Sequence, residues 1–165
     1  MKRRTLLLSL LTLSAVAFAA ALFIRSTSAY GFAGPSASGH GTLVLPDGRK
    51  RQFSFNATQH ADGSVTGHAV IHNPDFDFRS HLEITCLLVS GNRASFGGAV
   101  RSSTDPFFEG QNGFFTVFDN GEPGKGNDTI SLVFFDPITA DACVGIGPND
   151  FEQMPIDSGN VHVRP

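Results

Sequence analysis

The chain has 165 residues, with 12 Lys or Arg against 15 Asp or Glu, and its formal net charge is −3. This length predicts a single domain. Because 41% of the residues are hydrophobic and only 16% are charged, the composition excludes an intrinsically disordered chain and a basic nucleic-acid binder.

The N-terminus has the layout of an export signal. Lys2-Arg3-Arg4 precedes an uncharged, largely apolar run over residues 6–24, and the small residues Thr27-Ser28-Ala29 fit a cleavage site. We therefore expect a signal peptide over residues 1–29 and a secreted or periplasmic protein. The alternative is an uncleaved N-terminal membrane anchor, since the apolar run is long enough to span a bilayer.

Residues 30–39 have the Gly, Ser and Pro content of a flexible leader, which places the folded domain at residues 40–165. Loss of residues 1–29 removes four basic side chains, leaving 8 basic and 15 acidic ones and a net charge of −7. Charge repulsion then disfavours nucleic acids and anionic lipid surfaces. We expect no nucleic-acid partner and no membrane insertion after signal cleavage.

From residue 40 onward, short alternating runs separated by turn residues predict antiparallel strands. In Gln52-Phe53-Ser54-Phe55-Asn56 the two Phe face one side and the polar residues face the other. Leu82, Ile84 and Cys86 form a similar apolar set. The eight predicted strands lie at about 40–45, 50–58, 64–72, 80–89, 92–101, 112–119, 128–135 and 158–164.

Eight sequential strands with short connections predict an all-β fold, an up-and-down antiparallel meander. Closure into a β-barrel, with the last strand paired to the first, would cover the apolar face. A sandwich of two sheets is the alternative. The interior of such a barrel is either filled by side chains or holds one small ligand.

The mature part of the chain contains both cysteines, Cys86 and Cys143. An even number of cysteines in an exported protein predicts a disulfide, and two buried free thiols are the alternative. The bond would attach the long connection over residues 136–157 to the fourth strand. We interpret that connection as a cover over one end of the barrel.

Three residues on the third and fourth strands are candidate metal ligands. If the two strands pair so that His72 faces His81, then Glu83 lies on the same face within reach of both histidines. Two His and one carboxylate form a ligand set that zinc accepts. The alternative is that these are solvent-exposed polar residues.

The segment over residues 118–128 combines glycines with five oxygen-bearing side chains, which are Asp119, Asn120, Glu122, Asn127 and Asp128. Oxygen ligands on a glycine-rich loop are typical of calcium sites, although the spacing is not that of an EF-hand. Asp and Asn also stabilise turns by bonding to backbone amides. Both interpretations remain open at this point.

The same segment carries a resemblance. Asp-Asn-Gly-Glu-Pro-Gly at residues 119–124, followed by Asp-Thr-Ile-Ser at 128–131 and Gly-Asn-Val-His-Val at 159–163, resembles a family of small exported bacterial β domains, the post-COAP-like domains. The resemblance covers roughly residues 39–164. It implies an exported all-β module and supplies no activity or catalytic residue.

The sequence contains no recognisable catalytic motif, so no catalytic residue and no cofactor are assigned. We expect a monomeric, non-enzymatic module that binds a small apolar ligand or a cell-envelope partner. Sugar binding is disfavoured because the chain has 16 Phe but one Tyr and no Trp. The alternatives are a barrel enzyme like the lipocalins or allene oxide cyclases and a metal-binding protein.

Overall fold

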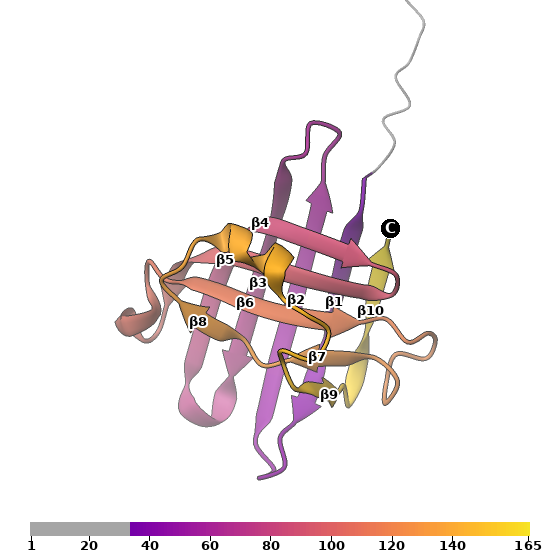
Figure 1. The fold of residues 1–165 in the computed structure, drawn as a ribbon. Helices are drawn as coiled ribbons and strands as arrows, with labels where there is room; N and C mark the ends of the chain where they lie inside the picture. Colours follow the sequence, from indigo (N-terminus) through magenta and orange to yellow (C-terminus); the bar gives the residue numbers. More distant parts are fainter. Residues whose placement is uncertain (1–33) are drawn as a thin grey trace, which may run out of the picture. The chain divides into compact units, whose positions relative to one another are not determined.

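The computed structural model describes residues 34–165. The predicted signal peptide and the first four residues of the predicted leader lie outside the described residues. The described part is all-β, with three short 3-10 helices, η1 (Pro74–Phe76), η2 (Pro106–Phe108) and η3 (Ala140–Gly145) (Figure 1). Its strands are β1 (Ser36–Val44), β2 (Lys50–Gln59), β3 (Val65–Asn73), β4 (Phe78–Ser90), β5 (Arg93–Ser103), β6 (Asn112–Phe118), β7 (Thr129–Ser131), β8 (Phe134–Asp136), β9 (Gln153–Pro155) and β10 (Ser158–Arg164).

All ten strands belong to one antiparallel sheet in the order β10-β1-β2-β3-β4-β5-β6-β7-β9, and β8 also pairs with β6. The expected pairing of the last strand with the first is confirmed, with Gly41 opposite Gly159. The sheet curls into a half-barrel that stays open (Figure 1). The closed ladder of eight strands expected from the sequence is thus not formed, because β10 and β9 are the two ends of the strand order.

Besides shifts of one or two residues at several strand ends, the strand layout differs from the sequence-based expectation in three ways. β1 begins at Ser36, so residues 36–39 pair in the sheet and are not part of a flexible leader. The strand expected at 128–135 is divided into β7 and β8 because the Ser131 hydroxyl, in place of a backbone carbonyl, accepts the N–H of Thr116 at 2.9 Å. The short strand β9 lies within the connection that was expected to contain none.

The main core lies on the inner face of the curled sheet and is built around phenylalanine rings. Phe96 and Phe115 stack with their ring centroids 4.5 Å apart, and Phe55 packs edge-on against both rings. A pocket among the core residues, bounded in part by Phe53 and Ile71, has a volume of only about 20 Å³. This is little more than the space that one water molecule needs.

A second, smaller core lies on the opposite face of β4, β5 and β6. The disulfide between Cys86 and Cys143 is confirmed, and its sulfur atoms pack with Phe114 beneath η3. Cys86 reaches this face because the β4–β5 register shifts between Ile84 and Cys86, and such a bulge reverses the side-chain alternation. The expectation that Leu82, Ile84 and Cys86 share one face was therefore wrong for Cys86.

The connection between β8 and β9 covers a sheet face and not one end of a barrel. The guanidinium of Arg93 on β5 donates hydrogen bonds to the carbonyls of Ile146 and Gly147, at 2.6 and 2.9 Å. Burial under this cover lowers the pKa of Arg93. The residues of β5 from Arg93 to Gly98 are all buried, so the prediction of one buried and one solvated face fails for this part of the strand.

Candidate binding face

The outward-facing residues of β10, β1, β2, β3 and β4 form continuous rows across the five paired strands, and these rows are polar except at Val70. We call this surface the polar face. Its first row runs across all five strands through directly opposed pairs and consists of Ser158, Thr42, Gln52, His72 and Arg79.

Two further rows lie beside the first, each displaced by two residues along the strands. The second row consists of Asn160, His40, Ser54, Val70 and His81. The third row consists of His162, Ser38, Asn56, His68 and Glu83. Five of the six histidines of the chain therefore lie on the polar face, where cross-strand neighbours are about 5 Å apart.

The whole first row and the three central residues of the second row, His40, Ser54 and Val70, line a depression of about 500 Å³. Its side chains include His40, Gln52, Ser54, His72 and Arg79. Gly41 and Gly159, opposed in the β1–β10 pair, also border it. The depression is large enough for a small polar ligand or for one residue of a polymer.

The polar groups in the depression are only partly engaged with each other. His72 Nδ1 lies 3.1 Å from Oε1 of Gln52, so this amide oxygen accepts the imidazole N–H and the amide nitrogen is left to donate. The guanidinium of Arg79 forms no ion pair with any residue of 34–165. On the third row, by contrast, Glu83 forms an ion pair with Arg101 of β5.

Charge is unevenly distributed over the sheet. All but one of the 15 acidic residues lie outside β10, β1, β2, β3 and β4, the exception being Glu83. Three exposed cations, Lys50, Arg79 and Arg164, lie on these strands. An acidic protein thus carries a face on which basic and imidazole groups predominate.

The candidate metal ligands lie on this face, but not in the register on which their assignment depended. The observed pairing places His72 opposite Arg79, His81 opposite Val70 and Glu83 opposite His68. His72 is hydrogen-bonded to Gln52, and Glu83 is engaged by Arg101. Among residues 34–165, no group of three or more His, Cys, Asp or Glu side chains is arranged to hold a metal ion.

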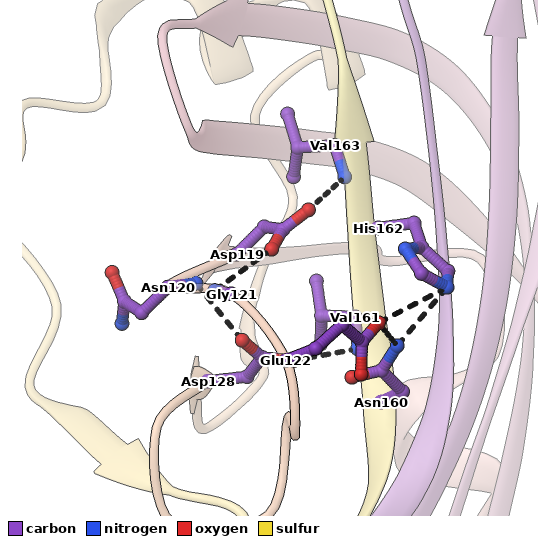
Figure 2. A network of polar contacts seen from close by, with 9 residues as sticks. All are labelled: Asp119, Asn120, Gly121, Glu122, Asp128, Asn160, Val161, His162 and Val163. Atoms are coloured by element: carbon purple, nitrogen blue, oxygen red, sulfur yellow. Dashed lines mark hydrogen bonds and ion pairs between the residues drawn. The ribbon is translucent and has the colours of Figure 1, made fainter.

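The oxygen-rich segment between β6 and β7 binds the edge of β10 (Figure 2). Asp128 is fully buried, and its carboxylate accepts the N–H of Asn120 at 2.9 Å and that of Val161 at 2.8 Å. Asp119 accepts the N–H of Gly121 at 3.2 Å and that of Val163 at 3.0 Å. These two carboxylates bridge the opening of the half-barrel, between the β6–β7 segment and β10. We call this bridged opening the seam.

The other members of the proposed calcium set are also hydrogen-bonded within the protein. Asn120 donates to the Asn127 carbonyl, and Asn127 donates to the Pro123 carbonyl, both at 2.8 Å. Glu122 accepts the Asn160 amide at 2.6 Å (Figure 2). The observed contacts are those of turn and edge stabilisation, and they engage side-chain oxygens of Asp119, Glu122 and Asp128.

Sequence reasoning recognised the separate strands but not the rows that they form. Alternate positions of β1, β2 and β3 carry Ser, Thr, His, Asn or Gln, which is the signal of a solvated face. Which of these residues become neighbours depends on the register, and a shift of two residues replaced His81 by Arg79 opposite His72.

Comparisons with known proteins found no match to any family model, curated protein or solved structure. Within residues 34–165, none of the helices has the length and apolarity needed to cross a bilayer.

Proposed function

We propose that this chain is an exported, non-enzymatic binding module whose polar face holds a polar ligand or partner of the cell envelope or extracellular medium. The observation that carries the proposal is the depression of about 500 Å³ on rows of polar side chains that are only partly engaged with each other. No fold requirement explains these rows, since solvated positions of a sheet tolerate most polar residues.

The polar face is a better site than the interior for a ligand. An apolar ligand inside the sheet would have to displace the stacked rings of Phe96 and Phe115, which are fully buried. Their burial contributes about 2 kcal/mol for each side chain. The polar face can accept a ligand without disturbing this packing.

Export is supported by the disulfide, because such bonds persist in oxidising compartments. The resemblance to the post-COAP-like domains is consistent with an exported module of this kind. Mass spectrometry of the protein recovered after expression of the full chain tests this part. We expect a monomer that begins at Tyr30 and has both cysteines oxidised; a retained N-terminus in the membrane fraction would contradict signal cleavage.

Binding is tested by incubating the labelled exported protein with intact cells of the producing species. We expect retention of the wild-type protein and its loss in Ser54→Phe, because the larger ring fills the depression without entering the core. Ser90→Phe is the matched control, since Ser90 is an exposed residue at the far end of β4. Absence of wild-type retention, or equal retention of both variants, would contradict the proposal.

A further inference from the structure

We propose that the depression on the polar face binds an oxyanion, namely a carboxylate, sulfate or phosphate group carried by a polar ligand, with Arg79 as the principal anchor. This inference rests on the proposed function and specifies the chemistry of its ligand.

The first argument is that the Arg79 guanidinium is available. The backbone of Arg79 is fixed on both sides, by pairing with His72 of β3 and by hydrogen bonds to Thr104 at 3.0 and 2.9 Å. Its side chain is exposed and forms no ion pair within the described residues. A guanidinium presents five N–H donors in a plane, a geometry that matches two oxygens of a carboxylate, sulfate or phosphate group.

The second argument is that hydrogen-bond donors line the same depression as this cation. Gln52 is two strands from Arg79 in the same row, and its amide nitrogen is left to donate because its oxygen accepts the His72 N–H. The hydroxyls of Thr42 and Ser54 also line the depression. A ligand that carries an anionic group to Arg79 can therefore place its other polar groups against these donors, as partly desolvated polar groups require.

The third argument is electrostatic. None of the described residues that line the depression is acidic. The acidic side chain on the surrounding strands, Glu83, is engaged by Arg101. Asp157, which precedes Ser158, and Asp75 and Asp77 at η1 are near in sequence, but they do not line the depression. Arg79 is thus the charged lining residue, and it favours an anion although the whole chain is acidic.

The test compares dextran sulfate with uncharged dextran, which share one polymer backbone and differ in charge. Binding of the exported protein is measured by isothermal titration calorimetry at pH 7.5. We expect binding to dextran sulfate, no binding to uncharged dextran, and competition by inorganic sulfate.

Two variants with the same change in net charge separate a site from diffuse attraction. Arg79→Gln should weaken binding by about tenfold or more, whereas Lys125→Gln, in the segment between β6 and β7, should change it less than twofold. Equal weakening by the two variants, or equal binding of dextran, would overturn the inference. If Arg79→Gln fails to fold, the wild-type protein is titrated with dextran sulfate and its amide chemical shifts are followed by NMR. Changes confined to residues of the first two rows support the site, and changes elsewhere overturn it.

Failure of this inference is distinguishable from failure of the proposed function. If cells retain the protein in a manner that Ser54→Phe abolishes while dextran sulfate does not bind, the polar face is a binding site for a ligand that is not an oxyanion. If the protein is not retained by cells and does not bind dextran sulfate, both proposals are overturned.

Discussion

The outer face of the sheet is exposed to solvent in one region and covered by another segment of the chain in a second region. In β2, exposed polar residues alternate with the buried Phe53, Phe55 and Ala57, so the outer face is left to solvent. In β5, the residues from Arg93 to Gly98 are all buried, since the inner core packs on one face and the disulfide-linked cover packs on the other. The same strand geometry thus supports a surface for recognition in one region and a sealed second core in the other.

The two regions differ in what their outward side chains contact. Gly97 of β5 approaches the cover so closely that a Cβ atom there would lie 2.2 Å from the Ala140 carbonyl oxygen, and a Cβ atom at Gly41 of β1 would lie 2.1 Å from the Ser158 carbonyl oxygen. Close backbone packing therefore occurs in both regions. The outward side chains of the sealed region are buried under the cover, whereas most of those on the polar face are exposed, so the polar face can carry side chains suited to binding with little effect on stability.

The largest test of this comparison is removal of the disulfide. Cys86→Ala/Cys143→Ala should lower the free energy of unfolding by about 4 kcal/mol, because the bond closes a loop of 57 residues in the unfolded chain. Urea titration measures the loss. Hydrogen exchange should rise over residues 137–151 and stay unchanged in β2; equal increases in both regions would contradict the division.

The seam, which joins the two regions, provides the next test. Asp128→Asn replaces one acceptor oxygen with an amino group that faces a backbone N–H, either that of Asn120 or that of Val161. We expect a loss of about 3 kcal/mol, as for a buried hydrogen bond to a charged group that becomes unsatisfied. Asp62→Asn, at an exposed hairpin, is the control and should be nearly neutral in the same urea titration.

A third test addresses the close approach of the cover to the sheet. Gly97→Ala places a methyl group against the Ala140 carbonyl and should destabilise the protein by about 2 kcal/mol, as overpacking does. Thermal unfolding followed by circular dichroism measures the change. A melting temperature equal to that of the wild type would show that the cover is not held against β5.

The smallest effect is expected on the polar face. Ser54→Ala should change the free energy of unfolding by less than about 0.5 kcal/mol, because Ser54 is an exposed strand residue. The measurement is again a urea titration. A loss of several kcal/mol would mean that the rows serve the fold, and it would remove the main reason for assigning them to binding.

Most of the strand layout could be predicted from local pattern, because alternation and turn residues are properties of neighbouring positions. The pairing of Cys86 with Cys143 and of β1 with β10 followed from cysteine number and from the need to cover strand edges. The open ladder could not be predicted, because it depends on Asp119 and Asp128 taking N–H groups that a neighbouring strand would otherwise bind.

The candidate site was harder to predict than the fold. The histidines and Glu83 could be recognised from the sequence as metal-binding residue types. Their neighbours depend on the β3–β4 register, which cannot be read from the residues that connect the two strands. The observed register places His72 beside Arg79 and not beside His81, the neighbour on which the metal-binding hypothesis depended. The composition of the rows follows only from the pairing of all five strands.

The seam also affects how the protein behaves at high concentration. An exposed edge strand offers free N–H groups to which another molecule can add a strand, and this is a common route to aggregation. On β10, the N–H groups of Val161 and Val163 are already bound by carboxylates of the same chain. An incoming strand would have to displace a buried negative charge before it could form its first hydrogen bonds, so the open half-barrel is protected against growth from this edge.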